Sequence, residues 1–318
     1  MRHETVRRLK CYAGGQAYCL DAGRVLSIER GAQMQPNSSA EGPVGWIEGR
    51  ERRIPVYGMA ERLGRGRQME QLGPVLVIDA PSPWGLAVDR VSRLQDAAAS
   101  PQPVPPAILP ARAAGVRGVI IDNGSLVVYF SPDCLHPDAP PVPLAPAMPP
   151  PQAIRDPGAP DPAGAGRLLL FSPANPMTPG LLPTTRSRLL LAFSYSQVAE
   201  IVPGLEHAAV PATPSHVLGM IAWRGHPVAV VDVGVLLGLA PVKRRADDRL
   251  LIARSPRWRS TIAIPVGGEI QSRALPLPHR PCRLAMDLSH ARGCFELADE
   301  EFVVVPDVDA MAGPEMRA

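Results

Sequence analysis

Apolar residues along the chain fall in short runs that end at glycine, proline or polar residues. Runs of this kind, rich in β-branched residues, are typical of short buried strands. The pattern predicts strands in the first half at 18–28, 75–79, 86–91 and 126–130, and in the second half at 189–201, 250–254, 260–266 and 302–305. Many short strands separated by turn signals favour β-barrels or sandwiches, so we predict a mainly β fold.

Two short helices and one tight hairpin complete the predicted elements. We expect helices over Met59–Leu63 and Val233–Leu237, each followed by a glycine, Gly64 or Gly238, as is common just past a helix end. Asp122-Asn123-Gly124 lies between two apolar runs, which is a strong signal for a two-residue hairpin turn.

The two halves of the chain repeat each other. Residues 45–64 and 219–238 align at a constant offset of 174, and six of these 20 positions are identical. Because the similarity extends to strand-like runs before and after this block, it indicates two copies of one domain and not an array of short units.

Proline marks the boundary between the copies. The chain holds 39 prolines among 318 residues, about 12% against a usual share of roughly 5%. Residues 137–165 contain 11 of them, and no hydrophobic period continues through that stretch. We therefore predict a first domain at 1–136, a Pro/Ala-rich linker at 137–165 and a second domain at 166–318. A further Pro-rich stretch at 172–185 is predicted to be an insertion, a long loop within the second domain.

Charge and cysteine content exclude several classes of protein. The net charge is only +3 and aromatic residues make up 4% of the chain, which gives little support for nucleic-acid binding. The five cysteines include no C-x-x-C pair, a usage typical of reduced thiols and not of a disulfide framework or a zinc site. No signal peptide or membrane-spanning run is visible, so we expect a cytoplasmic location without membrane insertion.

Catalytic signatures are missing from the sequence. It has no G-x-S-x-G, H-E-x-x-H, Walker loop or complete G-x-G-x-x-G, and its seven histidines lack metal-ligand spacing. Cys134 and His136 could form a nucleophile–base pair, but they lie between Pro132 and Pro137, which favours a loose chain end. We predict no enzymatic activity, no cofactor and no metal.

An ordered series of short motifs in the second half carries the most specific signal. The series comprises Val198-Ala199-Glu200-Ile201, Val217-Leu218-Gly219, Trp223-Arg224-Gly225, Pro227-Val228 and Val231-Asp232-Val233. It resembles the CheW family of chemotaxis coupling proteins. The first half has a fainter version, made up of Val25-Leu26-Ser27-Ile28, Val44-Gly45, Arg50, Ile54-Pro55-Val56 and Gly85-Leu86-Ala87-Val88-Asp89-Arg90-Val91.

The resemblance implies a fold and a function. Each copy is expected to be a pair of small SH3-like five-stranded β-barrels with one short helix. The function expected is that of a non-enzymatic adaptor that couples the cytoplasmic tips of chemoreceptors to a CheA-type histidine kinase, with other CheW-like proteins as further partners. One alternative is a degenerate regulator of another kinase array, such as one for surface motility. A second alternative is an arginine-rich barrel that binds nucleic acid.

The resemblance also implies partner-binding residues, namely Val198, Glu200, Arg224, Gly225, Asp232 and Arg50. The first copy departs from the pattern, with Ser27 in place of the glutamate and Gly58 in place of the aspartate. We predict an ion pair between Glu200 and Arg224. In the first copy, we expect Arg50 to be free or to turn to Glu29.

Overall fold

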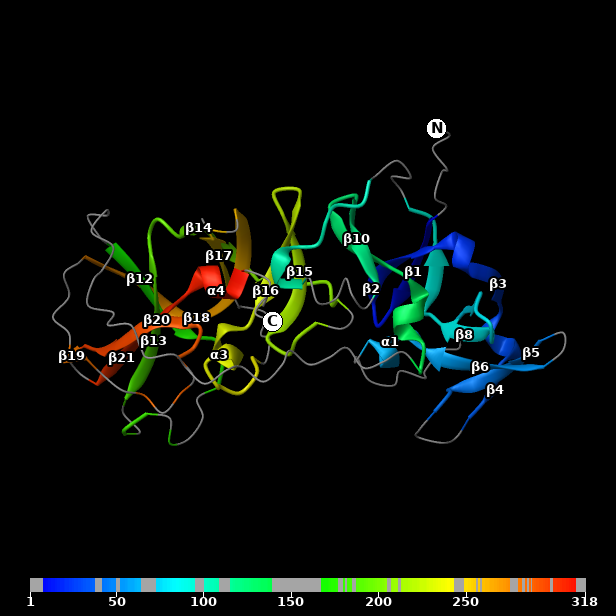
Figure 1. The fold of residues 1–318 in the computed structure, drawn as a ribbon, viewed down its shortest axis with the longest axis horizontal. Helices are drawn as coiled ribbons and strands as arrows, with labels where there is room; N and C mark the ends of the chain where they lie inside the picture. The colour runs from blue at the N-terminus through cyan, green and yellow to red at the C-terminus, as the bar shows by residue number, and fades with distance from the viewer. Residues whose placement is uncertain are drawn as a thin grey trace.

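The computed structural model is almost entirely β-structure, as predicted (Figure 1). It describes residues 8–37, 42–49, 52–63, 73–94, 100–108, 115–138, 167–176, 180, 182–184, 187–204, 207–210, 213–242, 249–255, 257, 259–274, 280–281, 284, 286, 288–297 and 300–312. Most of the predicted linker, and the loops that carry Arg50, Gly64 and Lys243, lie outside these residues. The predicted domain boundaries therefore stay predictions.

The first half folds into two sheets. Five strands pair in the order β10-β11-β2-β1-β9 and six in the order β3-β7-β8-β6-β5-β4. The bounds are β1 (Arg8–Ala13), β2 (Gln16–Asp21), β3 (Val25–Glu29), β4 (Gln35–Pro36), β5 (Gly45–Glu48), β6 (Arg53–Gly58), β7 (Val75–Ile78), β8 (Trp84–Ala87), β9 (Arg90–Ser92), β10 (Val116–Asp122) and β11 (Ser125–Phe130). The helical segments are η1 (Ala22–Arg24), η2 (Gly31–Gln33), α1 (Met59–Arg62), η3 (Pro106–Ile108) and η4 (Pro132–Leu135).

The second half repeats this arrangement, but its two sheets merge into one of ten strands. The bounds are β12 (Arg167–Pro173), β13 (Arg188–Ser194), β14 (Val198–Pro203), β15 (Val217–Trp223), β16 (His226–Val231), α3 (Val233–Leu236), β17 (Arg249–Ser255), β18 (Ser260–Ala274), β19 (Arg280–Pro281), β20 (Ala291–Glu296), β21 (Glu301–Pro306) and α4 (Val308–Ala312). The merger is due to β18, whose 15 residues pair with β16 and β17 at one end and with β12 at the other. The first half breaks the same path at Val88-Asp89, between β8 and β9.

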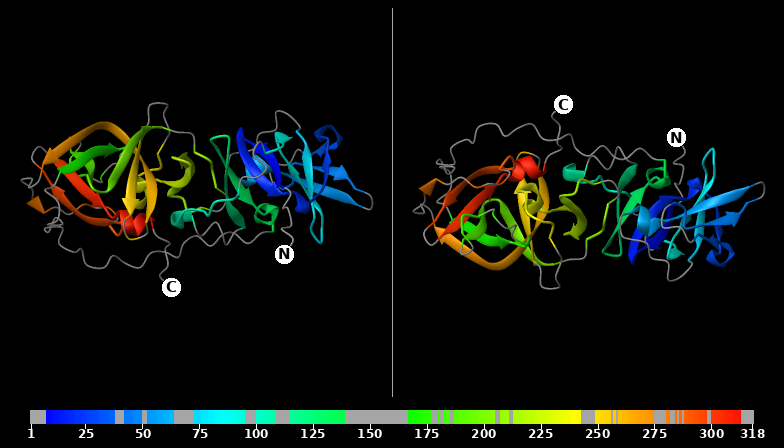
Figure 2. Two further views of the ribbon diagram at one scale, coloured as in Figure 1. Left: turned by 90° about the horizontal axis from the view of Figure 1, so that it is seen from above. Right: turned by 90° about the horizontal axis from the view of Figure 1, so that it is seen from below.

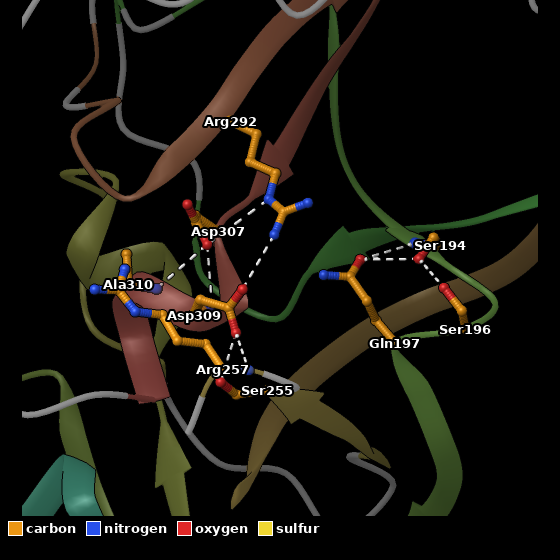
Figure 3. A network of polar contacts seen from close by, with 9 residues as sticks. All are labelled: Ser194, Ser196, Gln197, Ser255, Arg257, Arg292, Asp307, Asp309 and Ala310. Atoms are coloured by element: carbon orange, nitrogen blue, oxygen red, sulfur yellow. Dashed lines mark hydrogen bonds and ion pairs between the residues drawn. The ribbon is translucent and has the colours of Figure 1, made fainter. Parts of the chain in front are cut away.

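Three of the predicted strands are wrong in extent. The run at 86–91 divides at Val88-Asp89 into β8 and β9, which belong to different sheets. The run at 18–28 divides into β2 and β3, because Asp21 accepts a hydrogen bond from the Gly23 amide at 2.9 Å and starts η1. The run at 189–201 divides into β13 and β14 at a turn where Gln197 Oε1 accepts from the Ser194 amide at 3.3 Å (Figure 3). In the first half the chain passes between its two sheets at each break, and in the second half it passes between two distant strands of the ten-stranded sheet. Hydrophobic pattern alone does not reveal these changes of direction.

The hairpin and both helices are confirmed. Asn123 (φ 52°) and Gly124 (φ 77°) form the two-residue turn between β10 and β11. The expected closure of each sheet into a five-stranded barrel is not seen in the strand pairing of the described residues. The six-stranded sheet is open, and it ends at β3 on one side and at the two-residue strand β4 on the other.

The two halves pack side by side in one elongated molecule (Figures 1 and 2). The five-stranded sheet of the first half lies next to the β15–β16 hairpin of the second. Gln16 Oε1 accepts from the Ala209 amide at 2.9 Å, and Gln102 Nε2 donates to the Gly225 carbonyl at 3.1 Å. One cluster of buried apolar residues includes members of both halves, such as Ile108 of η3 and Met311 of α4. The tandem arrangement is therefore held by polar and apolar contacts in addition to the covalent connection.

Carboxylates fasten the last helix, α4, to the second half (Figure 3). Asp307 Oδ1 accepts from the backbone amides of Asp309 and Ala310, at 3.0 and 3.3 Å, and so caps the start of the helix. Asp309 Oδ1 accepts from Ser255 Oγ at 2.6 Å at the end of β17, and Asp309 Oδ2 accepts from Arg292 Nη2 at 3.3 Å on β20. These bonds connect α4 to two strands that lie far apart in the ten-stranded sheet, β17 and β20.

A buried aspartate holds α3 and the predicted insertion together. Asp232 is the N-cap residue of α3, where Oδ1 accepts from the Val235 amide at 3.2 Å and Oδ2 accepts from the Val242 amide at 3.0 Å. Asn175, from the Pro-rich stretch between the paired neighbours β12 and β13, donates from Nδ2 to Asp232 Oδ1 at 2.7 Å. The Asn175 side chain lies over Gly234, where an added Cβ would overlap it. The insertion thus contributes a buried residue to the fold.

We expect Asp232→Ala to lower the free energy of unfolding by about 2–4 kcal/mol. The change removes a helix cap, one of the two acceptors of Asn175 Nδ2 and the acceptor of the Val242 amide. Urea unfolding followed by circular dichroism measures the loss. The matched control is Gly58→Ala, since Gly58 precedes α1 in the first half and makes no side-chain cap. A loss for Asp232→Ala no larger than that for the control would contradict this role.

Candidate functional site

The candidate site lies where edge strand β14 meets the β15–β16 hairpin. β14 pairs with β17 on one side only, and its register shifts between Val198 and Glu200. The hairpin turns through Arg224 (φ 50°) and Gly225 (φ 78°), between the paired residues Trp223 and His226. Positive φ at both central residues is the conformation of a type I′ hairpin turn, which glycine adopts without strain and arginine rarely does. The turn therefore fixes the backbone position from which the Arg224 side chain extends.

Glu200 joins the edge strand to the hairpin. Its Oε2 atom accepts from Arg224 Nη2 at 2.9 Å and from Trp223 Nε1 at 3.0 Å. The Arg224 guanidinium carbon also lies 4.8 Å from the centre of the Trp223 ring, a cation–π contact. The ion pair predicted from the sequence is thus present, and Trp223 is a third member that sequence reasoning quoted but did not single out. Its place directly before the arginine was the available signal.

The two charged side chains stay accessible to a partner, and Trp223 is half-buried against the apolar cluster of β15 and β16. The side chain of Arg224 is 63% exposed and that of Glu200 is 38% exposed. Exposed ion pairs contribute only about 0–1 kcal/mol to stability, so the fold does not depend on this one. What the contacts provide is a fixed orientation for a charged and aromatic surface. We call Glu200, Trp223 and Arg224 the β14–β15 triad.

The other predicted site residues have different placements. Val198 is half-buried against the apolar core, and the Gly225 carbonyl accepts the Gln102 bond from the first half. Asp232 is only 1% exposed and both of its oxygens hold internal bonds, which gives it a structural role and leaves no surface for a partner. Arg50 lies outside the described residues.

The first half presents a different surface at the matching place. Ser27 occupies the register position of Glu200, directly after the same shift in register, and its Oγ donates to Glu29 Oε1 at 2.7 Å. The adjacent Leu26 and Ile28 are 56% and 49% exposed. The edge strand β3 therefore presents a serine between two apolar side chains, whereas β14 presents the acid. The two copies have therefore diverged in the chemistry they offer.

The prediction of a loose chain end at Cys134 and His136 is wrong, because η4 packs Cys134 against the apolar core and Arg62 bonds to the carbonyl of His136. Burial raises the pKa of the Cys134 thiol to about 12, which keeps it protonated and a poor nucleophile. The ring of His136 packs edge-on against Trp84, with the ring centres 5.4 Å apart. In the part of the chain that the structure describes, no group of three or more His, Cys, Asp or Glu residues could hold a metal ion.

The basic residues that follow the two predicted helices are only partly described by the structure. The Arg62 guanidinium donates to the carbonyls of Leu135 and His136, both at 3.0 Å, so this arginine serves an internal contact. Lys243, Arg244 and Arg245 lie outside the described residues. None of the helices described is long and apolar enough to cross a membrane.

Comparison with known proteins identifies both halves. The family model of the CheW-like domain matches residues 8–138 and again residues 182–315. No curated protein matches the chain. Among solved structures, the crystal structure of the scaffolding protein TtCheW from Thermoanaerobacter tengcongensis is similar, with 16% identity and a TM-score of 0.37 over 46% of this chain and 86% of that one.

The two family matches begin 174 residues apart, which is the offset of the sequence repeat. The second match begins after β12, although β12 takes the place in its sheet that β1 takes in the first half. The Pro-rich insertion lies between β12 and β13, so β12 falls outside the matched range. Both halves follow one pattern of strands, and the chain belongs to the CheW-like domain family.

Proposed function

We propose that the protein is a non-enzymatic adaptor in a chemotaxis-type signalling array. In this proposal it works in the cytoplasm and couples the cytoplasmic tips of chemoreceptors to a CheA-type histidine kinase. Family membership supports the role of scaffold, and the observation that carries the proposal for this chain is the exposed β14–β15 triad. It lies on an unpaired strand edge, next to a rigid hairpin, with one charged group of each sign and an indole ring.

Such a surface suits protein recognition. Tryptophan and arginine are the side chains most often found at the energetic centre of protein interfaces. A partner that covers the triad removes water from the Glu200–Arg224 pair, which strengthens its electrostatic contribution to specificity. The triad belongs to the second half only, so we propose that this half makes the charged contact with the kinase or receptor. Other CheW-like proteins are further candidate partners.

The first half has a separate role in this proposal. Its Gln16 and Gln102 contact the second half beside the triad hairpin, so it positions that hairpin from one side. Its own edge strand β3 lacks the acid, and Ser27 binds Glu29 instead. We therefore expect charge changes on the first half to leave the charged contact intact.

We expect Arg224→Glu to weaken the capture of a CheA-type kinase and receptor complex at least about tenfold, while the melting temperature stays within about 2 °C. The reason is that an exposed pair contributes little to folding but orients the interface. Glu200→Arg should have the same effect, and the double swap should restore part of the binding. Trp223→Phe, which keeps the ring but loses the Nε1 bond, should fall between these variants and the native protein. Pull-down and differential scanning calorimetry measure the two quantities.

The matched control is Arg53 with Glu48, a pair on the corresponding β5–β6 hairpin of the first half. Its N–O distance is 3.1 Å and its side chains are 60% and 63% exposed. Arg53→Glu should leave capture unchanged. Unchanged capture by Arg224→Glu, or an equal loss for Arg53→Glu, would refute the assignment of the contact to the β14–β15 triad.

A second prediction tests the absence of thiol catalysis. We expect Cys134 in the folded protein to react with iodoacetamide at pH 8 about 1000-fold more slowly than in urea, because a pKa of about 12 leaves little thiolate compared with an ordinary value of about 8.5. Peptide mass spectrometry follows Cys134 separately from the other cysteines. Fast alkylation of Cys134 in the folded state would reopen the enzymatic alternative.

A further inference from the structure

Two equivalent buried positions are charged in the first half and apolar in the second. Lys10 faces Cys19 across β1 and β2, and Leu170 faces Ala192 across β12 and β13. The pairing of β2 with β11 and of β13 with β21 makes Cys19 and Ala192 equivalent, so Lys10 corresponds to Leu170. In the same way Asp122 at the end of β10 corresponds to Leu297 after β20, since each is four residues beyond the glycine of a register shift.

In the first half Lys10 and Asp122 form a buried ion pair on one face of the five-stranded sheet. Lys10 Nζ lies 2.5 Å from Asp122 Oδ2, and the two residues are 7% and 1% exposed. Burial lowers the pKa of Lys10, but the bond to Asp122 and its negative charge outweigh burial and raise the pKa above its usual value. The lysine is therefore charged, and its charge is balanced by the aspartate.

In the second half the same positions are apolar. Leu170 and Leu297 are 0% and 5% exposed and belong to one cluster with Leu168, Leu190, Ala192 and Val303. The corresponding cluster of the first half contains only Cys19, Ile120 and Val127 as its buried apolar members. A buried charge is tolerated beside its partner and is costly beside hydrocarbon.

This difference bears on the misfolding of tandem repeats, in which equivalent strands of the two copies can exchange places. Strands β1 and β12 are homologous, each begins its half, and each lies at the same place between two partners in its sheet. We propose that the Lys10–Asp122 pair is a pairing determinant, which keeps β1 in the first half and β12 in the second during folding. If β12 took the place of β1, Leu170 would put hydrocarbon where Lys10 Nζ lies beside the buried Asp122. If β1 took the place of β12, Lys10 would be buried against Leu297.

The facing pairs on the opposite side of these strands act in the same direction. Cys11 faces Tyr18 in the first half, and Phe171 faces Leu191 in the second. Each pair joins a smaller side chain to a larger one, in opposite order. An exchanged β12 would put Phe171 against Tyr18 in a full core, and an exchanged β1 would put Cys11 against Leu191 with a void. The exchange of β12 would also separate Phe171 from Phe193, whose rings stack with centres 5.6 Å apart.

The test introduces a reporter for exchanged strands. Because Ser172 corresponds to Tyr12, which faces Ala17, cysteines at Ser172→Cys and Ala17→Cys face each other only when β12 lies in the place of β1. The full chain is refolded from urea and oxidised, and the cross-linked peptide is measured by mass spectrometry. We expect the yield to rise at least tenfold when Lys10→Leu and Asp122→Leu are combined, because the buried charges then no longer oppose exchange and only the size mismatch of the opposite face remains.

The matched control reverses the pair, with Lys10→Asp and Asp122→Lys. It keeps opposite charges at the two positions, so its yield should remain at the low value of the native pair. Size-exclusion chromatography adds a second measure, since exchange between two molecules produces dimers. Equal yields for the native and the Leu–Leu chains would overturn the proposal. So would a reversed pair that cross-links as strongly as the Leu–Leu chain.

Discussion

The structure depends on one constraint: in each half two layers of strands face a buried apolar cluster that extends through both halves. Within each half the chain passes from one layer to the other. β2 leads into β3 through η1, and β13 leads into β14 through a turn between Ser194 and Gln197. The long strand β18 makes the same crossing in the second half without a break. Because the layers share strands or short connections, neither layer can move independently, and the residues that face the core from both layers form one buried cluster.

Close backbone approach is the second requirement of this arrangement. The register shift before Met220 places Gly219 at φ 142°, where the Ala208 carbonyl occupies the space of a Cβ. That contact pairs Ala208 with Met220 and brings the neighbouring Ala209 amide to Gln16 of the first half. Gly118 does the same beside Gln102, whose side chain reaches Gly225. Glycines that look like turn residues in the sequence thus determine how the two halves meet.

Much of the architecture could be predicted because local chemistry decides it. The I′ turn at Asn123-Gly124, the helices after Gly58 and Asp232, and the equivalence of the halves all follow from short patterns. The ion pair of Glu200 with Arg224 was also predictable, since the family pattern names both residues. What the pattern could not show is which residues far apart along the chain come into contact. Asn175 reaches Asp232 across 57 residues, and Lys10 reaches Asp122 across 112.

Asp232 shows how a family motif can mislead at the level of single residues. An aspartate before a short helix reads equally well as a surface contact and as a helix cap, and only its burial separates the two. Its oxygens are fully used by Asn175, Val235 and Val242, so the second half needs the acid for its own fold. The first half replaces it with Gly58 and still forms α1, because no insertion has to be held there. At this position the two halves therefore differ in how the helix start is held: by a side-chain cap in the second half and without one in the first.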